Sequence, residues 1–181
     1  MADIVSEYFL SSDSVIECFV IEEKKSSNKS FKGRPIYQIN DFFELYDPSS
    51  IEIFVAISYH EQNKLREKYF KKFDSKKYRF ASYVSRHAVI QSDVIVGRNC
   101  LILEGTVIQK TCVVNDNSFI WTGVQIGHHS KILENSFIGS GSVLMGCNII
   151  GKNSHISAST TIKDHINVGK NTYTAIGSVI I

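Results

Sequence analysis

The sequence lacks several features that would assign it to a particular class of protein. Its 181 residues include only two prolines and one tryptophan, and its four cysteines (Cys18, Cys100, Cys112 and Cys147) show no CxxC or zinc-ligand spacing. There is no apolar run of about 18 residues for a membrane span, and no signal peptide at the start. We therefore expect a cytoplasmic protein with small buried thiols, a catalytic thiol being the alternative.

The charge balance does not point to a particular partner, since the formal net charge is only +2. The most basic stretch, KLREKYFKKFDSKKYR (64–79), could attract phosphates or RNA, but it lacks the spaced aromatic side chains of a single-strand binder. We interpret it as the solvent-facing side of a helix. The sequence therefore predicts neither a nucleic-acid nor a membrane partner.

The composition changes near residue 80. Thirteen of the 20 Lys and Arg residues precede position 80, whereas ten of the 11 glycines follow position 90. The two parts therefore follow different structural rules. We expect one domain over residues 1–80 and a second over residues 81–181.

The first part alternates helix and strand patterns. Helices are predicted over 3–10, 39–46 and 60–73, the last with Leu65, Tyr69 and Phe73 on its apolar face. Strands are predicted over 15–21, 51–57 and 78–84, and a turn region over 26–35. This alternation indicates a small parallel sheet of βαβ units, a Rossmann-like α/β domain.

The second part is a six-residue repeat, the strongest signal in the sequence. Taking every sixth residue from position 84 gives fifteen aliphatic side chains: Val84, Ile90, Val96, Ile102, Ile108, Val114, Ile120, Ile126, Ile132, Ile138, Leu144, Ile150, Ile156, Ile162 and Val168. Four places after each stands a small or modest residue, with Ile166 as the exception. A period of six fits a three-sided column with one hexapeptide per face and about 18 residues per coil, stacked at the ~4.8 Å strand spacing. We expect a mainly β protein built on a left-handed parallel β-helix of about five coils.

The outside of this column carries more apolar side chains than a solvated surface needs. Trp121, Leu133, Phe137 and Met145 are predicted to fall at outward or corner positions. A regular apolar face usually marks an interface, so we expect the columns to pack side by side as a homotrimer. The alternative is that these are isolated exposed residues without a role.

Two adjacent histidines, His128 and His129 in WTGVQIGHHS (121–130), take the third and fourth places of their hexapeptide and therefore lie outside the core. An outward histidine beside a subunit groove can act as a general base. The alternatives are a solvated surface histidine, the interpretation given to His60, His87, His155 and His165, or a metal ligand. Zinc carbonic anhydrases of similar fold use three histidines, two of them five residues apart. No pair in the coils has that spacing, so no metal is predicted.

The stretch IWTGVQIGHHSKILENSFIGSGSVLMGCNIIGKNSHIS (120–157) resembles the NeuD/PglD-type sugar acetyltransferases, a hexapeptide-repeat family. The segment GRPIYQINDFFELYDPSSIEIFVAISYHEQNKLREKYF (33–70) is similar to their N-terminal nucleotide-sugar domain. The resemblance implies homotrimers with active sites between subunits, acetyl-CoA as co-substrate, and a sugar amine or hydroxyl as acceptor.

The resemblance also implies roles for individual residues. His128 corresponds to the general base, and His129 stands where relatives carry a glutamate that raises the basicity of the ring. Gly146 corresponds to the residue whose main-chain amide binds the thioester oxygen. The coenzyme would contact Phe137, Ala158 and Ile176.

The substrate residues implied by the resemblance lie in the first part. Glu22 and Glu23 would reach a ribose or sugar hydroxyl, with a solvated turn as the alternative. Ile57, Ser58 and Tyr59 match a second contact with the sugar nucleotide. Relatives begin with a strand and a Gly-rich loop before the helix that matches 2–10, and they continue beyond the position of Ile181. We therefore expect the first strand and the Gly-rich loop to be missing from the domain over residues 1–80, either because the start codon is annotated late or because this member binds its substrate without that loop.

The sequence thus predicts an acetyl-CoA-dependent sugar N- or O-acetyltransferase of surface polysaccharide, lipopolysaccharide or glycan biosynthesis, with His128 as general base. Two alternatives stay open: transfer of another acyl group, and a non-catalytic β-helix that binds or scaffolds.

Overall fold

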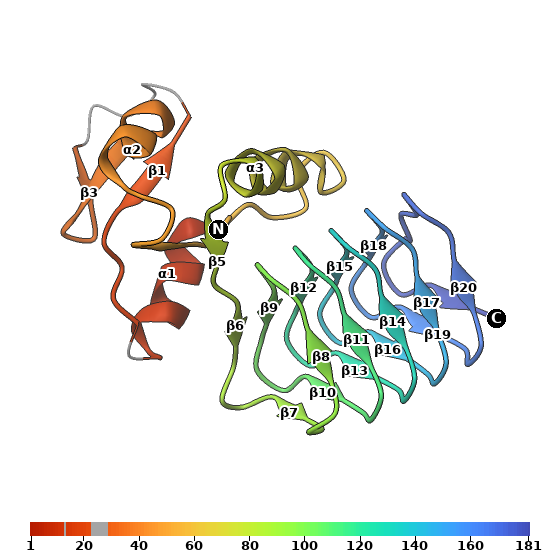
Figure 1. Cartoon of the computed structure of the whole chain (residues 1–181). Coiled ribbons are helices and arrows are strands. Elements are labelled where there is room, and N and C mark those ends of the chain that lie inside the picture. The colour runs from red at the N-terminus through yellow and green to blue at the C-terminus, as the bar shows by residue number, and fades with distance from the viewer. Residues whose placement is uncertain (13, 23–28) are drawn as a thin grey trace.

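The computed structural model describes residues 1–12, 14–22 and 29–181. A small region of helices and short strands lies at one end of a column of stacked coils, and the C-terminus lies at the other end (Figure 1). None of the described helices has both the length and the apolar character needed to cross a membrane.

The described part of the N-terminal region contains three helices, which overlap the predicted ranges. They are α1 (Ala2–Leu10), α2 (Ile39–Leu45) and α3 (Lys64–Ser75). Its five strands are β1 (Phe19–Ile21), β2 (Ser30–Phe31), β3 (Arg34–Gln38), β4 (Glu52–Ile53) and β5 (Arg79–Phe80). Phe42 and Phe73 contribute to an aromatic core between α2, α3 and the strands.

The strands form two small sheets, so the predicted single parallel sheet is wrong in detail. One sheet has the order β1-β3-β2 and the other pairs β4 with β5. The strand β3 begins inside the predicted turn region, and the predicted strand over 15–21 keeps only its last three residues, with Val15 68% exposed. A cavity of about 780 Å³ is bordered by α1, β1 and β4, which belong to different parts of the N-terminal region.

Residues from β6 onward wind into the predicted left-handed parallel β-helix, whose three sheets we name by their surroundings. The docked face, against the N-terminal region, holds β6 (Tyr83–Val84), β9 (Leu101–Ile102), β12 (Phe119–Ile120), β15 (Phe137–Ile138) and β18 (His155–Ile156). The valine face holds β7 (Val89–Ile90), β10 (Val107–Ile108), β13 (Gln125–Ile126), β16 (Val143–Leu144), β19 (Thr161–Ile162) and β21 (Val179–Ile180). The third face holds β8 (Ile95–Val96), β11 (Val113–Val114), β14 (Lys131–Ile132), β17 (Ile149–Ile150) and β20 (Asn167–Val168).

The six-residue repeat builds the core as predicted. Each strand pairs in parallel with the strand one coil away, so that Ile120 lies against Ile102 on one side and Ile138 on the other. From Ile102 to Ile162 the repeated aliphatic side chains are at most 1% exposed. Because each coil covers the apolar side chains of the next, stacking supplies the stability that a single coil lacks.

The corners between the faces have a backbone regularity of their own. Every sixth residue from Asn99 to Asn171 has positive φ, close to the left-handed conformation. These residues are asparagines on the corner between the third and docked faces, the asparagine corner: Asn99, Asn117, Asn135, Asn153 and Asn171. They are Gly105, Gly123, Gly141, Ser159 and Gly177 on the corner between the docked and valine faces, the glycine corner. They are Thr111, His129, Cys147 and His165 on the remaining corner, the histidine corner.

Side chains reinforce the stacking at these corners. On the asparagine corner each side-chain amide donates to the Oδ1 of the asparagine one coil further, at 2.6 Å from Asn99 to Asn117 and 2.7 Å from Asn117 to Asn135. The small residues of the repeat point inward, and five serine hydroxyls each donate to the carbonyl oxygen fifteen residues ahead: Ser118, Ser130, Ser136, Ser142 and Ser154. These asparagine amides and serine hydroxyls are therefore hydrogen-bonded.

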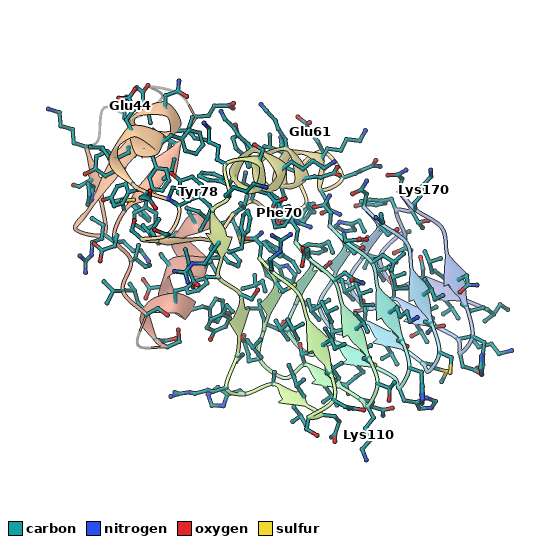
Figure 2. The ribbon with its side chains drawn as sticks, viewed as in Figure 1. Glu44, Glu61, Phe70, Tyr78, Lys110 and Lys170 are labelled. Atoms are coloured by element: carbon teal, nitrogen blue, oxygen red, sulfur yellow. The ribbon has the colours of Figure 1, made fainter. Side chains whose placement is uncertain are left out.

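The helix α3 joins the two parts of the molecule, and it lies along the coils in Figure 1. Arg66 is fully buried beneath it, where its guanidinium donates to the carbonyl oxygens of Asn117 and Ser136, both at 3.2 Å. The buried face is Arg66, Phe70 and Phe73, whereas the predicted Leu65 and Tyr69 are half-buried. Figure 2 shows Phe70 between α3 and the coils. A cation therefore lies at the centre of an interface that the pattern predicted to be apolar.

His155 is buried on the docked face, so its interpretation as a solvated surface histidine is wrong. Its ring stacks between Phe137 and Tyr173, with centroids 4.7 and 4.6 Å away, and Tyr59 packs edge-on at 4.9 Å. Burial, with a smaller contribution from the Arg66 charge, lowers the pKa of His155 from 6.5 to about 4. The ring is therefore neutral at pH 7.

We expect this histidine to make the protein less stable in mild acid. Between pH 6.5 and 4, His155 is protonated in the unfolded chain but stays neutral in the folded protein. The free energy of unfolding should therefore fall by about 2 kcal/mol from pH 7.5 to pH 5. His155→Phe should remove this part of the pH dependence, because Phe fits the same aromatic stack. Urea unfolding of both proteins at the two pH values measures the difference. Equal losses in both would contradict the assignment.

Candidate active site

The histidine corner presents His128 and His129 on the outside of the coils, as the repeat predicts. They follow β13 and Gly127, and both are exposed. His129 takes the left-handed position of its turn with φ of 59°, a conformation that histidine adopts more readily than most side chains. Lys110, one coil before His128 on the same corner, lies at the edge of the column remote from the N-terminal region (Figure 2).

The two rings contact each other through their Nδ1 atoms, which are 3.0 Å apart, and their planes are nearly perpendicular at 86°. One ring must donate and the other accept, so at least one imidazole in this pair is neutral. If His128 donates from Nδ1, its Nε2 carries the lone pair and is available to accept a proton. The Gln109 side chain accepts a hydrogen bond from the His128 main-chain N–H at 3.0 Å.

Gly146, one coil further, lies directly against the His128 ring. A Cβ at position 146 would lie 2.8 Å from Cε1 and 2.9 Å from Nε2 of His128, so only glycine leaves room for the ring in this position. Gly127 is equally constrained, because a Cβ there would lie 2.6 Å from the Gly146 nitrogen. Within the described residues the Gly146 N–H donates to no protein acceptor. An exposed imidazole and a free N–H donor therefore lie side by side.

The residues predicted to bind the coenzyme lie elsewhere on the column. Ala158 and Ile176 are on the glycine corner, Ala158 half-buried and Ile176 79% exposed. Phe137 is on the docked face and only 5% exposed, covered by Tyr59 at 5.1 Å and by the His155 ring. Phe137 is therefore buried within its own chain, not outward as predicted. Within one chain, His128, His129 and Gly146 lie together. Phe137, Ala158 and Ile176 lie away from this group.

The predicted substrate residues are engaged with α3 and the docked face. The Glu22 carboxylate accepts from Lys68 Nζ at 3.2 Å and from the Tyr69 hydroxyl. The carbonyl oxygens of Ile57 and Ser58 accept from Arg66 Nη1, at 3.4 and 3.2 Å. Tyr59 is 50% exposed beside Phe137. Glu23 lies outside the described residues.

Two residues near the site, Gln109 and Cys147, and one remote from it beneath α3, Arg66, had no sequence prediction of a role. Gln109 lies one coil before Gly127, and Cys147 lies one coil after His129. Their signal was the spacing of 18 residues, which places side chains of successive coils in one column. Arg66 was hidden in a basic helix, where no pattern distinguishes a buried arginine from a solvated one.

The comparisons with known proteins agree first on the class of repeat. Residues 111–146 match the family model for the bacterial transferase hexapeptide (six repeats). The matched stretch contains His128, His129 and Gly146. No curated protein matches the chain.

Solved structures then identify particular proteins of the same fold. Perosamine N-acetyltransferase from Caulobacter crescentus, in complex with CoA and GDP-perosamine, has a TM-score of 0.88 at 19% identity, covering 99% of this chain and 83% of that chain. The acetyltransferase domain of PglB from Neisseria gonorrhoeae FA1090 has a TM-score of 0.86 at 19% identity, covering 99% and 85%. The expected likeness to hexapeptide-repeat sugar acetyltransferases is thus confirmed in fold over nearly the whole chain.

Proposed function

We propose that this protein is an acetyltransferase that transfers the acetyl group of acetyl-CoA to an amine or hydroxyl of a nucleotide-linked sugar. The observation that carries the proposal is the pairing of an exposed imidazole, His128, with the unpartnered N–H of Gly146 directly beside it. Two structures of the same fold are described as complexes with acetyl coenzyme A and with CoA and GDP-perosamine. The four free thiols fit a reducing, cytoplasmic location.

The chemistry needs one proton transfer and one stabilised oxyanion. The acceptor nitrogen or oxygen attacks the thioester carbonyl carbon while His128 Nε2 takes its proton. The carbonyl oxygen gains negative charge, and the Gly146 N–H donates to it. When the tetrahedral intermediate collapses, the carbon–sulfur bond breaks and the CoA thiolate receives the proton from the His128 imidazolium. The acetylated sugar and free CoA thiol leave.

His129 takes the place of the assisting carboxylate in this scheme. In the tautomer that the scheme requires, the His128 Nδ1–H donates to His129 Nδ1 and the lone pair lies on His128 Nε2. A neutral histidine stabilises the resulting imidazolium less than a carboxylate would. Unlike a carboxylate, it carries no charge that has to be desolvated in the site. We therefore assign His129 as the positioning residue for the base.

Replacing His129 should lower kcat while leaving KM for acetyl-CoA nearly unchanged. We expect His129→Ala to lose about ten- to a hundredfold in kcat, because the His128 tautomer is no longer fixed. His129→Asn tolerates the left-handed backbone and offers Oδ1 as an acceptor, so it should recover part of the loss. Steady-state kinetics of both variants test this. An equal loss in both, or an effect on KM alone, would contradict a positioning role.

The site is completed by a homotrimer in this proposal. The outward residue within each strand of the valine face is uncharged: Val89, Val107, Gln125, Val143, Thr161 and Val179. The exposed Lys163 directly follows β19. This face lies between the histidine and glycine corners. When three columns pack with parallel axes and valine faces inward, the histidine corner of each meets the glycine corner of the next at the same height.

The neighbouring glycine corner offers a suitable channel for a coenzyme arm. Thr122, Ser140, Ala158 and Ile176 form one column, each a coil further along the axis. The Thr122 and Ser140 hydroxyls are 3.2 Å apart, at the height of His128 and Gly146. The channel is polar beside the base and apolar below it, which suits a thioester followed by a pantetheine chain. This arrangement explains why Ala158 and Ile176 are remote from His128 within one chain.

The function is tested by following CoA thiol release with acetyl-CoA and a panel of nucleotide-linked amino sugars. We expect release with at least one sugar and none without an acceptor, together with a trimeric mass in light scattering. Acyl-CoAs of greater length separate acetyl transfer from transfer of a longer chain. A protein that binds no acetyl-CoA by titration calorimetry would instead be a scaffold, and the proposal would fail.

A further inference from the structure

The histidine corner also assembles a set of soft metal ligands. His128, His129 and Cys147 each offer one ligand atom, and these atoms all lie within 4.8 Å of one another. No other group of three or more His, Cys, Asp or Glu side chains in the described ranges is comparably close. We propose that this trio binds a zinc ion or another ion of similar softness, and that the bound ion inhibits the enzyme.

The backbone holds the three residues in position for a common ligand. His129 and Cys147 have φ of 59° and 60° and occupy equivalent places in successive coils. The Cys147 N–H donates to the His128 carbonyl oxygen at 2.8 Å, which fixes one turn against the other. Rotation of side chains alone therefore brings the ligand atoms together, without any change in the coils.

The spacing of the donors suits a tetrahedral ion. The two Nδ1 atoms are 3.0 Å apart, similar to the separation of two nitrogen ligands bonded to one zinc ion at about 2.0–2.1 Å. Both histidines are exposed and Cys147 is half-buried, so an ion can enter from solvent. Two imidazoles and a thiolate leave the fourth position to water. The thiol of Cys147 loses its proton to solvent as the metal–sulfur bond forms.

Inhibition follows from the electron pairs of the imidazole. A neutral ring has one lone pair, and coordination to a metal uses it, so a metal-bound His128 cannot accept the proton of the acceptor. This part rests on the proposed function, whereas the binding of the ion does not. The ion is therefore expected as an inhibitor and not as a cofactor.

Cobalt and zinc titrations of the full chain test the site. Adding Co²⁺ should produce the near-ultraviolet band of a thiolate–cobalt bond at one ion per chain, and Zn²⁺ should displace it and stop acetyl transfer. Cys147→Ser should abolish the band and weaken zinc binding at least about tenfold, since even residues that only support metal ligands contribute that much. This variant should keep the uninhibited rate, because Ser159 shows that serine accepts the same backbone conformation.

Two matched variants serve as controls. His165→Asn changes the next residue of the same corner column, and Cys18→Ser removes a half-buried thiol of the N-terminal region. Both should retain the cobalt band. A wild-type protein without a band, or a band that persists in Cys147→Ser, would overturn the inference. An inactive protein that still shows the band would contradict the proposed function but would support the proposed metal site.

Discussion

His128→Ala is expected to leave a folded trimer that transfers acetyl groups about 10²–10⁴-fold more slowly than wild type. The side chain is exposed and contributes nothing to the aliphatic core, so its removal should not change the unfolding midpoint. In the proposed mechanism it removes the acceptor for the proton of the attacking amine or hydroxyl. The loss should appear in kcat, with acetyl-CoA affinity retained.

The matched control is His165→Asn, which changes an exposed histidine of the same corner two coils further on. Its rate should equal that of wild type. Thiol release measured for both variants at saturating acetyl-CoA decides the assignment. If His128→Ala retained the wild-type rate, the base would have to be another residue.

Arg66→Met should produce the largest loss of stability of any substitution proposed for this chain. The guanidinium is fully buried, lies 4.2 Å from the Phe119 ring centroid, and donates to the Asn63 Oδ1 and to four main-chain carbonyls. All five acceptors are neutral oxygens. Burial lowers the pKa of Arg66 to about 9, which still leaves it charged at neutral pH.

Methionine matches the length of the arginine stem but donates no hydrogen bond. Several buried carbonyls would lose their donor, and we expect the free energy of unfolding to fall by about 3–5 kcal/mol. Lys71→Met changes an exposed cation of the same helix and should cost no more than about 0.5 kcal/mol. Urea unfolding measures both changes. A loss below about 1 kcal/mol in Arg66→Met would show that α3 is held by its aromatic contacts alone.

The sequence was sufficient to predict the column because a period of six has one physical solution. An inward aliphatic residue at each rung and a small residue at each corner leave no other regular arrangement, and Ile102 through Ile162 are buried as expected. The place of His128 outside the coil followed from the same count. The asparagine corner could also have been predicted, since Asn99, Asn117 and Asn135 recur every 18 residues.

The N-terminal region was harder to predict because its contacts are not periodic. A basic helix gives no sign that Arg66 is buried, and the interpretation of His155 as solvated failed because the covering residue, Tyr59, comes from a distant segment. The strands β1 and β4 are short and lie in separate sheets, although their sequences are as apolar as longer strands. The burial of these residues depends on contacts with distant parts of the chain, which the local sequence pattern does not indicate.

Mixed trimers test most directly the central claim that neighbouring chains share each site. His128→Ala lacks the base, and Ala158→Trp blocks the channel on the glycine corner, so each variant alone should be inactive. Co-expressed with different tags and purified through both, every mixed trimer has one site with an intact base facing an intact channel. We predict about a third of the wild-type rate. Mixed trimers as inactive as the parents would contradict the shared site.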